Sequence, residues 1–123
     1  MGKNTMKILK LEVGQPPVVK SIGMNLEDLQ AEVEGLIELI SLDTDCVAVC
    51  NEECKINGMK PNRRIGGDII CGPFFICRDD GEKFGSLTEE QIQKYSLQFA
   101  EIQTFTGNEP ELEPRFEICD FQF

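Results

Sequence analysis

The 123-residue sequence contains no histidine. This absence excludes serine and cysteine mechanisms with an imidazole base, and it excludes metal centres with histidine ligands. The chain also lacks a P-loop and a Gly-x-Gly-x-x-Gly pattern. Some of its 22 acidic residues could hold a metal such as Mg²⁺, but the spacing of these residues in the sequence does not distinguish a metal site from an ordinary solvated acidic surface. We therefore expect no catalytic residue and no cofactor, and an enzyme is the least favoured function.

Long apolar runs are also missing, since none approaches the length of a membrane-spanning helix. The first ten residues mix lysine with short apolar pairs, which is unlike a signal peptide. We therefore expect a cytoplasmic protein that does not enter a membrane. Only 12 basic residues oppose the 22 acidic ones, so the formal net charge is −10 at pH 7. This charge disfavours direct nucleic-acid binding and favours contact with basic protein surfaces.

Six cysteines are present, but no Cys-x-x-Cys pair occurs. Cys46, Cys50 and Cys54 are spaced by four, which leaves a zinc site as an alternative. In a reducing compartment paired cysteines are rare, and most of these thiols lie within apolar runs. We therefore favour buried, unpaired thiols and predict no metal ligand.

The pattern of apolar residues and turn signals predicts an α+β fold. We expect a small mixed or mostly antiparallel sheet of about five to six strands and two helices, in the order β-β-α-β-β-β-α-β. Asn25 is the predicted N-cap of the first helix, and a capping box over residues 86–89 opens the second, whose core face includes Ile102. Residues 52–67 carry three turn signals and predict a long loop or irregular hairpin. The predicted strands cover residues 6–13, 18–22, 36–42, 46–51, 68–77 and 116–123.

The chain divides into one domain over residues 1–106 and a tail over residues 107–123. The tail begins as an acidic linker and ends in a possible strand with three phenylalanines. That strand would pack on the same domain or on a partner, including a second copy of the chain. The Phe74-Phe75 pair could stack on a base, but we favour one ring in the core and the other against a neighbouring element.

One segment differs from the acidic background, because residues 55–64 contain four basic residues and no acid. Neighbouring arginines in a Gly- and Pro-rich loop suit the recognition of phosphate or carboxylate groups. The alternative is that the arginines pair with surface acids and that the asparagines close turns. The predicted ligand-binding residues are Asn51, Glu52, Lys60, Asn62, Arg63, Arg64 and Asp68.

Four segments, residues 49–53, 60–64, 67–76 and 86–91, have a familiar pattern, and the pattern extends over about residues 6–100. They resemble a family of short proteins of unknown function, family 3846, found in phages, plasmids and other mobile elements of Gram-positive bacteria. The resemblance implies a protein that acts on a bacterial host, for example against a defence system, and it implies no catalytic residue. It places the family's polar motifs around Asn51, Glu52, Asn62, Arg63 and Asp68.

Two functions follow as hypotheses. In the first, a non-enzymatic protein binds a nucleotide-like or anionic small molecule, with Arg63 and Arg64 on the phosphates and Asn62 and Asp68 on hydroxyl or base groups. In the second, an acidic inhibitor occupies the nucleic-acid groove of a host or defence enzyme, with the acids of the tail among its contacts.

Overall fold

Two antiparallel sheets and two α-helices form residues 5–113, the part of the chain that the structure, a computed structural model, describes. The strands are β1 (Thr5–Leu11), β2 (Val18–Gly23), β3 (Ile37–Asp43), β4 (Cys46–Asn51), β5 (Pro61–Ile65), β6 (Asp68–Cys71), β7 (Phe74–Asp79) and β8 (Phe84–Gly85). The helices are α1 (Leu26–Val33), α2 (Glu89–Gln98) and the short 3-10 helix η1 (Pro110–Leu112). One sheet has the order β2-β1-β7-β4-β3 with β8 beside β7, and the other pairs β5 with β6. The predicted α+β class is confirmed, and the predicted strand at residues 116–123 lies outside the described residues.

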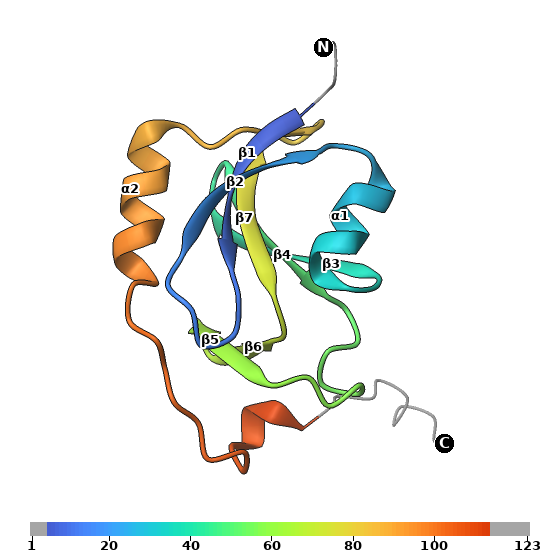
Figure 1. The fold of residues 1–123 in the computed structure, drawn as a ribbon, viewed down its shortest axis with the longest axis vertical. Helices are drawn as coiled ribbons and strands as arrows, with labels where there is room; N and C mark the ends of the chain where they lie inside the picture. Colours follow the sequence, from blue (N-terminus) through green and yellow to red (C-terminus); the bar gives the residue numbers. More distant parts are fainter. Residues whose placement is uncertain (1–4, 114–123) are drawn as a thin grey trace.

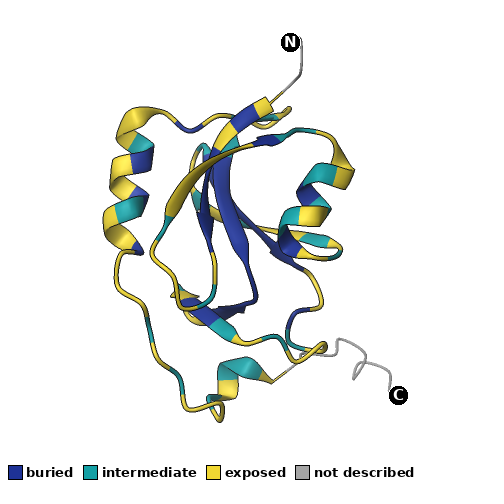
Figure 2. Cartoon of the chain, viewed as in Figure 1, coloured by how far each residue is buried: buried dark blue, intermediate teal, exposed yellow. Residues whose placement is uncertain are grey.

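The six-stranded sheet is apolar on both faces, and a helix covers each face (Figure 1). In β4, Ala48 and Cys50 join the core cluster on the α2 side, whereas Val49 joins the cluster on the α1 side. In β7 the same alternation puts Phe74 on the α2 side and Phe75 on the α1 side, so neither ring is free to stack on a base. The central strands are buried along most of their length, and the outer faces of both helices are exposed (Figure 2).

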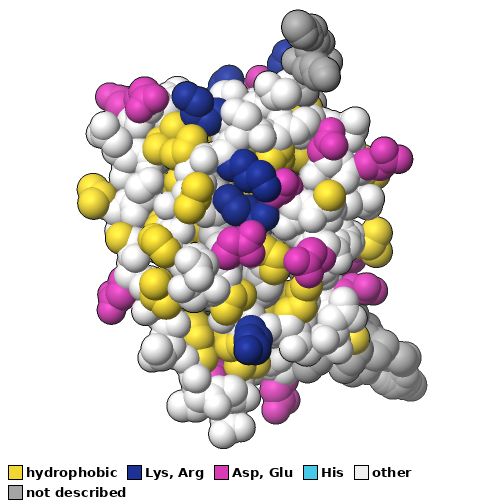
Figure 3. All heavy atoms as spheres, viewed as in Figure 1, with side chains coloured by type: hydrophobic (Ala, Val, Ile, Leu, Met, Phe, Trp, Pro, Cys, Tyr) yellow, Lys and Arg dark blue, Asp and Glu magenta, His cyan; other side chains and the backbone are white. Residues whose placement is uncertain are grey.

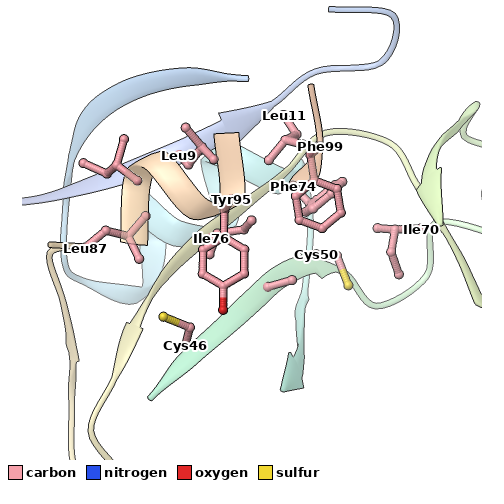
Figure 4. Packing of buried hydrophobic residues seen from close by; sticks show 12 residues of the cluster. Leu9, Leu11, Cys46, Cys50, Ile70, Phe74, Ile76, Leu87, Tyr95 and Phe99 are labelled. Carbon is pink, nitrogen blue, oxygen red and sulfur yellow. The ribbon is translucent and has the colours of Figure 1, made fainter. Parts of the chain in front are cut away.

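Helix α2 packs through aromatic rings on the centre of the sheet (Figure 4). The Phe99 ring meets the Phe74 ring edge to face, with 6.3 Å between ring centres, and Tyr95 stacks beside Phe99. The prediction that Ile102 continues this face is wrong, because the helix ends at Gln98 and Ile102 is exposed.

Side-chain caps begin both helices. The Asn25 side chain accepts a hydrogen bond from the Asp28 backbone N–H, as predicted. In α2 the capping box lies slightly beyond the predicted one, because Thr88 and Gln91 exchange the two capping hydrogen bonds. Neither helix is long and apolar enough to span a membrane.

The second sheet is the main departure from the predicted fold. Residues 52–67 were predicted as a loop or an irregular hairpin, and they include strand β5, which pairs with β6 in a hairpin with a register shift between Pro61 and Arg63. The single strand predicted for residues 68–77 is two strands, β6 and β7, which belong to different sheets. The chain changes sheet at Gly72, which has a φ of 74° and packs so closely on Met59 that a Cβ atom would lie 2.7 Å from the sulfur. The bend at residues 72–73 therefore separates two sheets.

The chain after α2 passes over the β5–β6 hairpin (Figure 1). Phe105 and Leu112 pack on a small core cluster made by Cys54, Ile69 and Cys71. This cluster lies on one face of the hairpin. Ile70 and Ile65 lie on the other face and pack into the main core. The hairpin thus has packed side chains on both faces.

Candidate functional site

A groove of about 770 Å³ opens between the large sheet and the β5–β6 hairpin. Three separate segments form its walls: residues 37–40 of β3, residues 50–56 at the end of β4 and the loop after it, and residues 67–70 at the turn and start of β6. Glu38 and Cys50 are register partners on β3 and β4, so they lie side by side on one wall. The groove therefore depends on the tertiary fold.

Asn51 holds the loop wall in place. Its side-chain Nδ2 donates to the carbonyl oxygens of Val33 and Glu34 at the end of α1, at 3.0 and 3.2 Å. Its Oδ1 accepts a hydrogen bond of 2.7 Å from the Glu53 backbone N–H. Asn51 is buried, and its side-chain amide connects α1 to the loop through hydrogen bonds to backbone groups.

The charged side chains of the groove are mostly acidic. Glu38, Glu52 and Asp68 contribute three carboxylates, whereas Lys55 contributes the only ammonium group among the lining residues. The Lys55 ammonium lies 2.6 Å from an Asp68 oxygen, so the one cation is paired within the groove. The rest of the lining is rich in isoleucine: Ile37, Ile40, Ile56, Ile69 and Ile70. The groove thus joins apolar surface to a net negative charge.

Three cysteines lie at or just behind the groove. Cys50 and Cys54 line it, and Cys71 packs against Cys54 in the small cluster. Burial raises the pKa of the Cys50 thiol to about 12, so this thiol is protonated at neutral pH. Interaction with the Cys71 thiol lowers the pKa of Cys54 to about 7, and the pKa of Cys71 is raised in turn.

The zinc alternative for Cys46, Cys50 and Cys54 has no matching geometry. Within residues 5–113, no group of three or more Cys, Asp or Glu side chains is arranged to hold a metal ion. Cys46 lies at the opposite end of β4 from Cys50, on the α2 side of the sheet.

The predicted phosphate-binding role of Arg63 does not fit its position, because the side chain is fully buried. Its Nε donates to the Phe99 carbonyl oxygen at 3.2 Å, and one terminal nitrogen donates to the Gln15 carbonyl oxygen at 2.8 Å. The other terminal nitrogen donates to the Asn62 side-chain oxygen at 2.7 Å. No carboxylate of residues 5–113 forms an ion pair with Arg63, but Phe99 caps the C-terminal end of α2, where the helix dipole favours a cation. Arg63 therefore joins three parts of the fold.

Asn62 is also structural. Its Nδ2 donates to the carbonyl oxygens of Leu11 and Gly72, at 3.0 and 2.9 Å, so it ties β5 to β1 and to the bend after β6. It is buried and unavailable to a ligand, so the prediction that it contacts ligand hydroxyls is wrong. The alternative that Asn62 closes a turn is also wrong, because Asn62 lies in β5 and its Nδ2 donates to backbone groups of other segments.

The two remaining basic candidates are exposed but do not line the groove. Arg64 pairs with Glu111 at 3.0 Å, and its guanidinium carbon lies 5.8 Å from the centre of the Phe105 ring. Lys60 lies in the loop before β5. Of the seven predicted site residues, the structure brings together Asn51, Glu52 and Asp68 and places the other four elsewhere. On the face shown in Figure 3, one central group of basic side chains lies beside acidic ones, and another basic side chain lies among hydrophobic neighbours.

Sequence reasoning missed Glu38 and Cys54 as residues of the site, and it placed Lys55 in the binding loop of residues 55–68 but not among the ligand contacts. Glu38 did carry a signal, because it is the only charged residue in the apolar stretch of residues 36–42. An acid at that place on an edge strand indicates a position open to solvent.

The comparisons with known proteins give a family. A family model described as a domain of unknown function (DUF3846) matches residues 6–100. The chain belongs to this family. The matched range runs from β1 to just past α2 and includes every residue that lines the groove. No curated protein and no solved structure matches the chain.

Proposed function

We propose that this DUF3846 protein is a non-enzymatic binding protein that holds a positively charged, extended segment of a partner protein in its acidic groove. One observation carries the proposal: three carboxylates line the groove against a single ammonium group, which is already paired. An anionic ligand would meet repulsion there, whereas a cationic one would be attracted. The net charge of −10 would also speed the approach of a basic partner.

The apolar part of the groove suits the same kind of ligand. Lysine and arginine side chains lay their aliphatic stems along apolar surface and keep their charged ends in polar surroundings. In this groove, Ile37, Ile40 and Ile56 would receive the stems, and Glu38 and Glu52 would pair with the charged ends. A small inorganic cation would gain nothing from the isoleucines.

The position of β3 favours an extended segment. β3 is an edge strand, and among the described strands it pairs only with β4. An edge strand offers backbone N–H and C=O groups to an incoming chain, which supplies affinity without dependence on sequence. Since β3 also lines the groove, a bound segment could follow the strand and place alternate side chains in it.

Of the two predicted functions, the one with a basic protein partner is better supported. The anionic-ligand hypothesis placed Arg63, Arg64, Asn62 and Asp68 on the ligand. Arg63 and Asn62 are buried and hydrogen-bonded within the fold, and Arg64 and Asp68 are each paired with an opposite charge. In the described part of the tail, the Glu109 carboxylate accepts hydrogen bonds from the backbone and Glu111 pairs with Arg64. The contacts are therefore assigned to the groove. The mobile-element setting, the bacterial cytoplasm and the action on a host stay predictions.

A nuclear magnetic resonance titration of the ¹⁵N-labelled full chain tests the proposal. The probes are a ten-residue peptide that alternates lysine with valine, the same peptide with glutamate for lysine, and ATP. We expect shift changes from the lysine peptide at Glu38, Glu52 and Lys55, which weaken as salt is added. Shift changes from ATP or the glutamate peptide at these positions, or a response to the lysine peptide only outside the groove, would refute the proposal.

A further inference from the structure

Beyond partner binding, the groove contains a thiol pair whose arrangement suits oxidation chemistry. We propose that Cys54 is a nucleophilic thiol site that reacts with a peroxide, and that Cys71 resolves the product by forming a Cys54–Cys71 disulfide. This site does not depend on the proposed binding function, because it rests on the two thiols, their surroundings and their access to the groove.

The fold brings these two cysteines together from different segments. Cys54 lies in the loop after β4, and Cys71 is the last residue of β6. The loop folds back on itself through a hydrogen bond of 2.9 Å from the Met59 backbone N–H to the Cys54 carbonyl oxygen. Two residues later Pro61 is the register partner of Cys71, so the loop returns to β6 next to that residue. Both side chains consequently pack in one small cluster with Ile69.

Cys54 is more accessible to solvent than Cys50 and Cys71. Cys54 is 8% exposed, whereas Cys50 is 2% and Cys71 is 1% exposed. The groove of about 770 Å³ beside Cys54 is far larger than a hydrogen peroxide molecule. A small oxidant can therefore reach Cys54, while Cys71 lies one side chain further in.

The surroundings also favour a thiolate at Cys54 over the other described cysteines. Hydrogen bonding from Cys71 and the positive charge of Lys55 oppose the effect of burial and lower the pKa of Cys54 to about 7. Burial raises the pKa of both Cys50 and Cys77 to about 12, and the pKa of Cys71 is raised as well, so none of these thiols competes with Cys54 for the first reaction with the peroxide. The thiolate is the nucleophile in such reactions, so Cys54 is the residue selected.

The chemistry balances with the peroxide as oxidant. The Cys54 thiolate attacks one peroxide oxygen, the O–O bond breaks, and the departing hydroxide takes up a proton and leaves as water. Cys54 then carries a sulfenic acid. The Cys71 sulfur attacks the Cys54 sulfur, the S–O bond breaks, and the second water leaves with the Cys71 proton. The peroxide gains two electrons and the thiol pair loses two.

Peptide mapping of the full-length wild-type protein tests the site. The protein is treated with one equivalent of hydrogen peroxide at pH 7, blocked with N-ethylmaleimide and digested without reduction. We expect a peptide pair linked through Cys54 and Cys71, while Cys50 is recovered as its maleimide adduct. A different linked pair, earlier oxidation of another cysteine, or no oxidation would overturn the proposal. This measurement needs no variant, so it decides the matter even if a substitution unfolds the chain.

Two variants separate the roles of the thiols. With Cys71→Ser, the sulfenic acid on Cys54 should persist and be trapped by dimedone, because the resolving thiol is gone. Cys50→Ser is the matched control and should still form the Cys54–Cys71 disulfide. Alkylation of wild-type Cys54 by iodoacetamide should rise with pH around a midpoint near 7, against about 8.5 for a free cysteine. A midpoint at or above 8.5, or loss of the disulfide in Cys50→Ser alone, would contradict the assignment.

Discussion

Replacement of Arg63 by alanine should strongly destabilise the fold, whereas the same change at the neighbouring Arg64 should have little effect. Arg63 is fully buried and makes four hydrogen bonds to carbonyl and amide oxygens. Arg64 is exposed, with one ion pair and one ring contact. The pair is a matched test because the residue type, the strand and the substitution are the same.

The expected magnitude follows from the acceptors left behind. Arg63→Ala removes the donors to the Phe99 carbonyl oxygen and to both oxygens of Asn62, which are buried residues. A buried acceptor without a partner costs about 1–3 kcal/mol, and water entering the space would recover part of this cost. The Gln15 carbonyl oxygen belongs to an exposed residue, so water can replace that bond. We expect a loss of about 3–5 kcal/mol of unfolding free energy for Arg63→Ala and about 1 kcal/mol or less for Arg64→Ala.

Thermal and urea unfolding, followed by circular dichroism, measure these losses. For a chain of this size we expect the Tm to fall by roughly 10–20 °C for Arg63→Ala and by only a few degrees for Arg64→Ala. Equal Tm values for the two variants would refute the structural role of Arg63. A Tm equal to that of the wild type for Arg63→Ala would refute the structural role even more clearly, and Arg63 would again be a candidate ligand contact.

Two further stability predictions concern the α1 side of the sheet. Burial alone would raise the pKa of Glu32, but hydrogen bonds and charge from Lys10 and Lys20 lower it overall. The ionised Glu32 carboxylate therefore stabilises the fold fully above its unfolded-state pKa of about 4.5, and this stabilisation is lost as the pH falls through the lower folded-state pKa. Glu32→Gln should therefore cost about 1–3 kcal/mol in urea unfolding at pH 7, and a cost that does not shrink below pH 4 would contradict this account. Gly35→Ala should also destabilise the protein, by about 1–3 kcal/mol, because a Cβ atom would lie 2.7 Å from the Asn51 Nδ2; an unchanged Tm would show that the amide can move without loss.

Local sequence signals were enough to predict the strands and helices whose patterns depend only on neighbouring residues. The strand at residues 46–51 was predicted with its observed limits because it is continuously apolar and rich in β-branched residues. Both helices were predicted from local capping signals, Asn25 for α1 and a capping box over residues 86–89 for α2, whose actual N-cap is Thr88. These features need no knowledge of distant contacts.

The site could not be predicted because its parts depend on distant contacts. Alternation along a strand puts Arg63 and Arg64 on opposite faces of β5. Which of the two is buried depends on how α2 and residues 99–113 pack on the hairpin, and the sequence pattern does not give that packing. The groove likewise needs the register of β3 against β4 and the change of sheet at Gly72. The basic stretch of residues 55–64 is therefore divided in the structure: Arg63 is buried, Lys60 and Arg64 are exposed, and Lys55 lines the acidic groove.

The most direct test of the central claim is a comparison of two charge reversals in calorimetric binding of the lysine–valine peptide. Glu52→Lys changes a carboxylate of the groove, and Glu82→Lys makes the same change in the exposed turn between β7 and β8. If the groove binds a cationic segment, Glu52→Lys should raise the Kd about 5- to 30-fold, which corresponds to roughly 1–2 kcal/mol, and Glu82→Lys should change it less than about twofold. Equal effects of the two reversals, or an unchanged Kd for Glu52→Lys, would contradict the account.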